Sequence, residues 1–554
     1  MLGHEELTRL TTLYASGRIS RRQLLRALAA AGSLAALTPI LAACGGGDDA
    51  PSAGGGTAGS QATAGSGQPA GGGKRGGTFT VGMSADVVTL DPPMFTDVYS
   101  NYVSSQIHEG LVWVDFTGNI APRLAEKFER PDPTSYVFTL RQGVRFHNGE
   151  ELTSDDVKYT IERLLSPELK SPRAGRLDMV KSIETPDKYT ARFLLKEPFT
   201  PFLDRLAGGW AYVVNKKAVD AAAGDYTHKP VGTGPFKYGD WKTGDRATLE
   251  RNDAYWGDKP LLDRVVFRPI PDQNTRLVEL ESGGLDYMMD VPPEEIKRLR
   301  DEKRLQVFEA PAINYSYLAY NVKKAPFQDN PKLRKALAHA INRKEINDVI
   351  YQGLGRPAIT SLTPESWGHN PNVEAYAYDP SRAKALLGES GYRGGDIELS
   401  CSEDPLVRRT AERIQAQAKE NLGLTVTIKA LEFGGFLNYI RTGEHQMFLL
   451  AWNGSVDPDS IVFPLFATKN HGAAGNRAFY SNPQVDKLLD DAQKAPDQER
   501  RKAMYQEAQK LIADDAPHVP IRHGSATAGA QKHVQGFQMH PLQAQVYTQV
   551  SLNK

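Results

Sequence analysis

Cysteine is almost absent from this 554-residue chain, which contains only Cys44 and Cys401. The two residues form no C-x-x-C pair and no cysteine cluster, so the sequence predicts neither a redox dithiol nor a structural zinc site. Cys44 stands directly before a run of glycines and has no apolar segment after it with which to form a core. A disulfide bond between this tail and Cys401 is not expected, and Cys44 needs another explanation.

The chain also lacks an excess of either charge, because 66 lysine and arginine residues balance 66 aspartate and glutamate residues. The first 43 residues hold five basic and two acidic side chains, which leaves 61 basic and 64 acidic side chains in the remainder. A protein that binds nucleic acid would carry a strongly basic face. The composition therefore argues against nucleic acid as a partner, and its 40% of apolar residues is typical of globular domains.

Sequence motifs for catalysis are missing as well. The chain contains no G-x-S-x-G nucleophile elbow, and its only lysine-bearing glycine run, at 71–78, lies outside any strand–helix context. The pair Asp155 and Asp156 comes at the start of an expected helix, where the helix dipole favours negative charge. His108 and His147 are isolated histidines, which are most often packing or surface residues. We therefore expect no catalytic residue, no metal site and no cofactor.

A long hydrophobic run is missing too. The most apolar stretch, residues 27–43, is rich in alanine and interrupted by Gly32 and Pro39. A membrane-spanning helix needs about 20 strongly apolar residues. The basic segment before this stretch and the small residues after it are typical of a signal peptide, which we place at residues 1–43. The alternative, a buried N-terminal helix, would have to run straight into glycines.

Two short motifs refine this prediction. SRRQLL, which begins at Ser20, resembles the twin-arginine export motif, although paired arginines also precede ordinary secretion signals. Residues 41–44 have the sequence LAAC, which ends at Cys44. This segment resembles a bacterial lipobox, and the resemblance implies that Cys44 carries the lipid anchor. Residues 45–77 include 14 glycines. This segment has too few apolar side chains to bury a core and fold. We therefore predict a flexible tether at residues 44–76.

From Gly77 onward the pattern changes to alternating strands and amphipathic helices. The sequence predicts a helix at about 98–109, a helix capped by Thr153 or Ser154, and a helix ended by Gly423 before a β-branched strand. Two further helices are expected on either side of Pro496. Helices and strands alternate through the second half without a repeat, which favours an α/β fold.

Aromatic residues gather in short segments of the second half. Any single one is most often a core residue, but aromatic side chains at strand ends beside glycine also suit a ligand cleft. The candidates for ligand contact are Tyr315, Tyr317, Phe433 and Trp452, together with Asn453 and Gly454, which follow Trp452.

From about Gly76 to Pro520 the chain resembles the extracytoplasmic solute-binding proteins of ABC importers, specifically the dipeptide/oligopeptide-binding family (bacterial solute-binding protein family 5). The order of many segments carries this resemblance, since no single one would be sufficient. They include GGTFTVGMSADVVTLDP, IHEGLVWVDFTGNIAPRLAEKFE, YVFTLRQGVRFHNGEELTSDDVKYTIERLL, PVGTGPFKYGDWKTGDRATLERNDAYWG, YNVKKAPFQDNPKLRKALAHAINR and YSNPQVDKLLDDA.

The resemblance implies an α/β, periplasmic-binding-protein-like clamp of two domains, with an extra lobe in the first domain. The chain would cross between the domains near Ala310 and near Pro517. The expected parts are domain I at 77–310 with the extra lobe at about 120–215, domain II at 311–515, and a C-terminal return to domain I at 516–554.

The resemblance also implies site residues. In peptide-binding members an aspartate three residues after the strand-end tryptophan pairs with the peptide amino group, but here that position is Ser455. Asp457, two residues further on, either takes over this role or caps a turn with Pro458. Arg173 is a candidate for binding a ligand carboxylate. The family's pocket loop corresponds to Thr96, Asp97, Val98 and Tyr99, and its pocket aromatics to Phe433 and Trp452.

These features together predict a monomeric, lipid-anchored, extracytoplasmic binding protein that captures peptides and delivers them to an ABC permease and its ATPases. Chelated nickel, an opine or an oligosaccharide is the alternative ligand, although His339, His369 and His445 are scattered in the sequence. An alternative from a different class of protein is an exported hydrolase with the same lipid anchor. Such an enzyme would need a pair of catalytic residues in the cleft. A sensory or chaperone role for the same binding fold is a weaker alternative.

Overall fold

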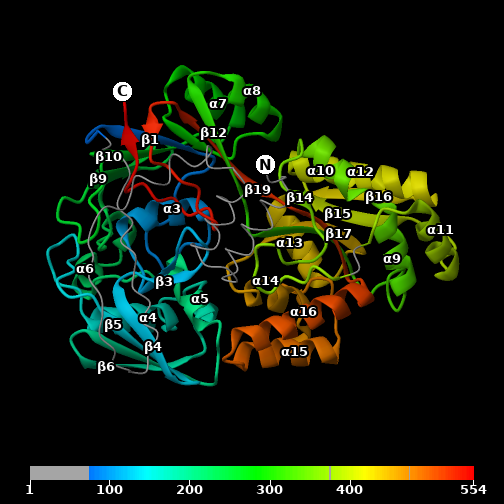
Figure 1. Ribbon diagram of the computed structural model, residues 1–554, viewed down its shortest axis with the longest axis horizontal. Helices are drawn as coiled ribbons and strands as arrows, with labels where there is room; N and C mark the ends of the chain where they lie inside the picture. The colour runs from blue at the N-terminus through cyan, green and yellow to red at the C-terminus, as the bar shows by residue number, and fades with distance from the viewer. Residues whose placement is uncertain (1–73, 374–375, 473–474) are drawn as a thin grey trace, which may run out of the picture. The chain divides into compact units, whose positions relative to one another are not determined.

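The computed structural model of the protein describes residues 74–373, 376–472 and 475–554. The predicted signal peptide, Cys44 and most of the predicted tether lie outside the described residues. In the described part of the chain, no helix combines the length and the apolar character that crossing a membrane requires. Figure 1 shows the described elements as two groups of strands and helices.

The first group is built on a seven-stranded sheet in the order β12-β19-β11-β1-β10-β9-β8. Strand β1 pairs in parallel with both β10 and β11, and its Phe79 and Val81 are fully buried on the face of the sheet that α3 covers. The strands are β1 (Thr78–Met83), β8 (Phe236–Lys242), β9 (Arg246–Arg251), β10 (Arg264–Pro269), β11 (Tyr287–Met289), β12 (Leu305–Pro311) and β19 (Ser525–Gln531). Helix α3 (Val98–Ile107) covers one face, and α7 (Gln273–Ser282) and α8 (Ile296–Asp301) cover the other.

A separate four-stranded antiparallel sheet, in the order β4-β5-β7-β6, is inserted into this group. Its strands are β4 (Ala125–Asp132), β5 (Ser135–Leu140), β6 (Val180–Asp187) and β7 (Thr190–Leu195). Helix α4 (Ser154–Leu165) packs on it and begins at Thr153, as predicted, with a capping box to Asp156. The sheet has its own apolar core, built from residues between Leu111 and Val213. We call this part the extra lobe.

The second group is built on a six-stranded sheet in the order β14-β18-β13-β17-β15-β16. Its strands are β13 (Asn314–Tyr320), β14 (Arg356–Pro357), β15 (Ile397–Ser402), β16 (Val426–Leu431), β17 (Met447–Asn453) and β18 (His518–His523). Side chains of β13 alternate between two cores: Leu318 and Tyr320 face one, and Tyr315 and Tyr317 face the other.

Helices cover both faces of this second sheet. One face is packed by α9 (Pro331–Ala340), α10 (Arg343–Ile350), α11 (Pro380–Glu389) and α12 (Pro405–Leu422). The other is packed by α13 (Phe433–Thr442), α14 (Asp459–Phe466), α15 (Pro483–Lys494) and α16 (Gln498–Asp515). As predicted, α12 ends at Gly423 in the left-handed conformation, and α15 and α16 are separated at Pro496. In Figure 1, α15 and α16 lie side by side beneath α14.

The chain crosses between the two large sheets twice. The first crossing joins β12 to β13 through Ala312 and Ile313, near the expected Ala310. The second lies at Gly524 rather than near Pro517, because residues 518–523 form β18 and pair with β13 in the second sheet. The two crossings are adjacent: the amide of Ala312 donates to the carbonyl of Gly524 at 3.1 Å, and the amide of Gly524 donates to Asn314 Oδ1 at 2.6 Å.

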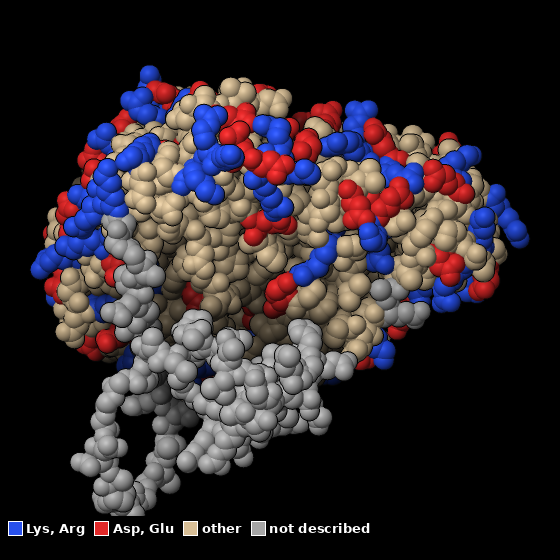
Figure 2. Space-filling view, turned by 45° about the horizontal axis from the view of Figure 1, so that its top comes forward, with Lys and Arg blue, Asp and Glu red and all other residues tan. Residues whose placement is uncertain are grey.

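We therefore call residues 74–312 with 525–554 the first lobe, which includes the extra lobe, and residues 313–523 the second lobe. The remaining short elements are β2 (Val112–Val114), β3 (Ile120–Pro122), α5 (Phe202–Leu206), α6 (Lys216–Ala221), β20 (Val534–Gln535) and β21 (Ser551–Leu552). Basic and acidic side chains are interspersed over the face in Figure 2, in keeping with the balanced composition.

Candidate ligand site between the lobes

A cavity of about 700 Å³ lies between the extra lobe and the second lobe. This volume falls in the range of pockets that enclose a small-molecule ligand. The extra-lobe side consists of Pro172, Gly175, Arg176, Asp178, Met179, Lys196, Glu197, Phe199 and Arg205. The second-lobe side consists of Trp452, Phe463, Pro464, Lys469, Asn470 and Gln493. A ligand here would contact both lobes at once.

Trp452 is the only predicted site residue that lines this cavity. It lies at the end of β17, where its ring is half-buried and its Nε1–H donates to the carbonyl of Ser460 at 2.9 Å. Gly454 follows, and a Cβ at that position would come within 2.4 Å of Ile461. The close approach fixes the loop after β17 against α14 and holds the tryptophan at the cavity edge.

Three arginine side chains approach the interface from the first lobe. Arg205, on α5, forms an ion pair of 2.7 Å with Asp459 across the interface. Arg173 donates from Nε to the carbonyl of Phe95 at 3.0 Å. Arg176 lies over the ring of Trp210 at 5.2 Å from the centroid. Burial, followed by the positive charges of Arg205 and Arg173, lowers the pKa of Arg176 to about 10, against a smaller opposing effect of Asp204.

Carboxylates also meet at the interface, and each has a partner. Asp204, on α5, accepts from the hydroxyl of Ser455 at 2.6 Å. Asp459 accepts from Arg205 and, at 2.9 Å, from Gln493. Burial raises the pKa of Asp204, and the neighbouring Asp457 raises it further. These contacts hold α5 of the extra lobe against the loop between β17 and α14.

Asp457 is bound within the second lobe. Arg501, on α16, donates to both of its carboxylate oxygens at 2.8 Å, and both side chains are nearly buried. The backbone amide of Asp459 also donates to Asp457 Oδ1 at 3.0 Å, which is the turn-capping arrangement. Asp457 borders a second cavity of about 280 Å³, which Asp204 also lines. Of the two roles considered for Asp457, this geometry favours the cap.

The predicted loop from the first lobe lies at the start of α3. Asp97 caps the helix by accepting from the amide of Ser100 at 2.8 Å, and its other carboxylate oxygen is buried without a partner among the described residues. Val98 is 49% exposed, Tyr99 contacts Ser84 through its hydroxyl, and Thr96 is exposed. None of these residues, nor Arg173, lines the 700 Å³ cavity.

Phe433 is also outside the cavity. It begins α13 and is 55% exposed. Asn453 and Gly454 lie at the crossing between the lobes, because the amide of Gly454 donates to the carbonyl of Ile313 at 3.0 Å. The structure therefore groups the region around Trp452 with the crossing and leaves Phe433 at the surface of the second lobe.

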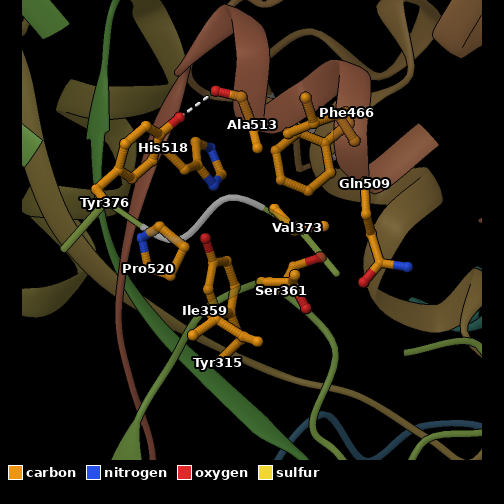
Figure 3. A pocket seen from close by; sticks show the side chains of 12 residues that line it. Tyr315, Ile359, Ser361, Val373, Tyr376, Phe466, Gln509, Ala513, His518 and Pro520 are labelled. Carbon is orange, nitrogen blue, oxygen red and sulfur yellow. Dashed lines mark hydrogen bonds between the residues drawn. The ribbon is translucent and has the colours of Figure 1, made fainter. Parts of the chain in front are cut away.

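Tyr315 and Tyr317 are 1% and 0% exposed in the core of the second lobe. Their rings stack with centroids 4.9 Å apart, and Tyr317 stacks on His518 at 4.3 Å. Tyr315 borders an internal cavity of about 20 Å³ (Figure 3), which has room for about one water molecule and none for a peptide. Core packing, the alternative reading for any single aromatic residue, accounts for both tyrosines.

Arg176, Arg205 and Phe463 line the cavity, but they were not predicted from the sequence. Each lies in a short helical segment whose sequence shows no distinctive motif, and only the docking of the extra lobe on the second lobe brings them together. The described residues contain no group of three or more histidine, cysteine, aspartate or glutamate side chains arranged to hold a metal ion.

The chain is similar to bacterial solute-binding proteins both in a family comparison and in comparisons with single proteins. Residues 119–474 match the family described as bacterial extracellular solute-binding proteins, family 5 Middle. The chain is 32% identical to the dipeptide-binding protein of Escherichia coli over 79% of this chain and 87% of that protein. It is 30% identical to heme-binding protein A of Haemophilus influenzae, over 94% and 98% of the two chains.

A solved structure shows the same architecture. The periplasmic binding protein DppA of Helicobacter pylori, in complex with the peptide STSA, superposes with a TM-score of 0.76 at 31% identity. The match covers 87% of this chain and 99% of that one. The α/β clamp with an extra lobe is thus a fold that the chain shares with a peptide-bound protein.

Proposed function

The chain belongs to family 5 of the bacterial extracellular solute-binding proteins, and we propose that it captures peptides, or solutes of similar size, for an ABC importer. Membership of this family makes it a binding protein and not an enzyme. The proposed ligand is chosen because the similar proteins are described as binding a dipeptide, heme or the peptide STSA.

The observation that carries the proposal is the 700 Å³ cavity, to which both lobes contribute side chains. A ligand that contacts Arg176 and Trp452 simultaneously makes its full set of contacts only when the lobes are closed. Such a ligand selects the closed form by those additional contacts. The closed form would then be the one that docks on the membrane permease.

Movement of the lobes is supported by the connections between them. Only the crossings at Ala312–Ile313 and at Gly524 join the two large sheets, and they lie beside each other. Adjacent crossings can act as one hinge, because a few backbone torsions then rotate one lobe relative to the other. We further propose Trp452 as a direct ligand contact. Asp97, Val98 and Arg173 do not line the cavity, and their contact with a ligand stays a prediction.

The experiment that tests this function identifies the ligand. The purified full chain is denatured and the released small molecules are analysed by mass spectrometry. A mixture of short peptides supports the proposal, whereas a single non-peptide mass would overturn the peptide part of it. Trp452→Ala should weaken rebinding of the released ligand at least about tenfold, as expected for an aromatic contact in a ligand site.

We also propose that Cys44 anchors the protein to the membrane through a lipid, after export by the segment 1–43. The support is the sequence pattern alone: a lipobox, a signal-like segment and a glycine-rich tether. Cys44→Ser should move the protein from the membrane to the soluble fraction without changing its ligand affinity. Retention in the membrane fraction would contradict the anchor, and a loss of affinity would contradict the tether.

A further inference from the structure

Arg176 stands out among the cavity residues because its guanidinium has no hydrogen-bond acceptor in the protein. In the part of the chain that the structure describes, it lies over the Trp210 ring at 5.2 Å but takes part in no ion pair and no hydrogen bond. Arg205, by comparison, is paired with Asp459 at 2.7 Å. The N–H donors of Arg176 are therefore left for water or for an acceptor group of a ligand.

The other cationic groups around the cavity act in the same direction. Arg205 and Arg173 are close enough to Arg176 to lower its pKa through repulsion between like charges, whereas Asp204 raises it to a smaller extent. An anion placed among these arginines would relieve the remaining repulsion. Lys196 and Lys469 also line the cavity.

Asp457 and Asp459 are not available to an ammonium group. Asp457 gives both oxygens to Arg501, and Asp459 is shared between Arg205 and Gln493. Asp178 and Glu197 line the cavity at its exposed rim, and Glu197 lies 3.4 Å from Lys494. Displacing Arg501 from Asp457 would leave a buried arginine without a partner, which costs more than one ligand contact returns.

We propose that the cavity takes a ligand by an anionic group, a carboxylate or a phosphate, held at Arg176, with an apolar part against Trp452, and without an ammonium anchor at Asp457. This inference rests on the proposed function, because it assigns a chemistry to the same site.

The test compares four probes on the purified full chain by calorimetry. They are the dipeptide Leu-Leu, its N-acetyl derivative, its C-terminal amide, and phenyl phosphate. The inference predicts that N-acetylation changes Kd less than about threefold. Removing the charge by amidation should weaken binding about 10- to 100-fold, the range for a lost hydrogen bond to a charged group.

Variants then assign the effect to Arg176. Arg176→Met should remove the preference for acid over amide, and Arg176→Lys should restore part of it, because lysine keeps the charge but not the planar fork. Lys487→Met is the control: Lys487 does not line the cavity, and its exposed ammonium group pairs with Asp491 at 2.6 Å on α15. That control should change Kd less than about threefold, and thermal melts verify folding of all variants.

The outcomes separate this inference from the proposed function. Tight binding of the amide together with loss of binding on N-acetylation would overturn the inference and leave peptide capture intact. Binding of phenyl phosphate alone, dependent on Arg176, would support the inference with phosphate as the anion and overturn peptide capture. Failure of all four probes to bind would overturn the inference, while the released-ligand experiment would still decide the function.

Discussion

Asp457 and Arg501 form a nearly buried ion pair at the edge of the binding region, with 10% and 5% of their side chains exposed. A buried pair of this kind adds little compared with apolar residues of the same shape, but removing one partner leaves an uncompensated charge. At the scale of single residues, such pairs decide which charged groups are free to bind a ligand.

Asp457→Ala should therefore lower the free energy of unfolding by about 3–5 kcal/mol, because Arg501 remains buried without its partner. Urea denaturation at neutral pH measures the change. The matched control is Asp491→Ala, which breaks the exposed 2.6 Å pair with Lys487 and should cost less than about 1 kcal/mol. Equal effects of the two substitutions would contradict the structural role assigned to Asp457.

His518 gives a second prediction, which concerns pH. Burial lowers its pKa to about 3 between the aromatic rings of Tyr317 and Phe466. The unfolded chain binds a proton with a pKa near 6.5, so stability is complete above that pH and falls as the pH drops toward the folded value. From pH 7 to pH 5 this residue alone should account for about 2 kcal/mol of lost stability.

His518→Phe should remove that share of the acid sensitivity. Urea midpoints measured at pH 7 and pH 5 should differ less in the variant than in the natural chain. A residual pH dependence is expected, because burial also lowers the pKa of His108 to about 3 and of His523 to about 4. An unchanged difference between the two pH values would show that His518 is not buried in its neutral form.

At the scale of elements, helix ends were the features that local sequence determined best. Thr153 begins α4 and Gly423 ends α12, as predicted, because capping depends only on neighbouring residues. The C-terminal return was placed too early for the opposite reason. Whether residues 518–523 pair with one sheet or the other is decided by β13, which is distant in sequence.

Gly423→Ala tests the helix end. Gly423 has φ +69°, so alanine there is strained although no atom lies within 4 Å of the added Cβ. The expected cost is about 1 kcal/mol in the free energy of unfolding. Gly388→Ala is the matched control, since Gly388 lies inside α11 with similarly open space and an ordinary φ. That change should stabilise the protein by about 0.5–1 kcal/mol, and destabilisation by both changes would contradict the assignment.

At the scale of the whole molecule, the contact of α5 with the loop after β17 joins the extra lobe to the second lobe. Ser455 takes part in it by donating its hydroxyl hydrogen to the buried carboxylate of Asp204 at 2.6 Å. Because this hydrogen bond joins the two lobes, it stabilises the closed arrangement relative to an open one. It does so without lining the 700 Å³ cavity.

Ser455→Ala should therefore weaken ligand binding about tenfold, although the residue does not line the main cavity, because closure loses a hydrogen bond to a charged group. Calorimetry gives Kd, and small-angle scattering with and without ligand reports closure. Ser481→Ala is the control, because its exposed hydroxyl contacts only His471 within the second lobe. An unchanged Kd together with full closure would contradict the proposal that the Ser455–Asp204 hydrogen bond stabilises the closed arrangement.

The sequence by itself determined the class of the fold, the family and the positions of several helix ends. The helix ends follow from capping residues and glycines, and the family follows from the order of its characteristic segments. These depend on residue type and short spacing, so they can be read along the chain. The cavity chemistry was decided only by tertiary structure. Arg176 and Arg205 line one cavity with Trp452 because the extra lobe docks on the second lobe, and Asp457 is paired because α16 brings Arg501 to it. Electrostatic contacts depend on distance in space, and no local pattern in the sequence specifies which charges will be paired and which will remain for a ligand.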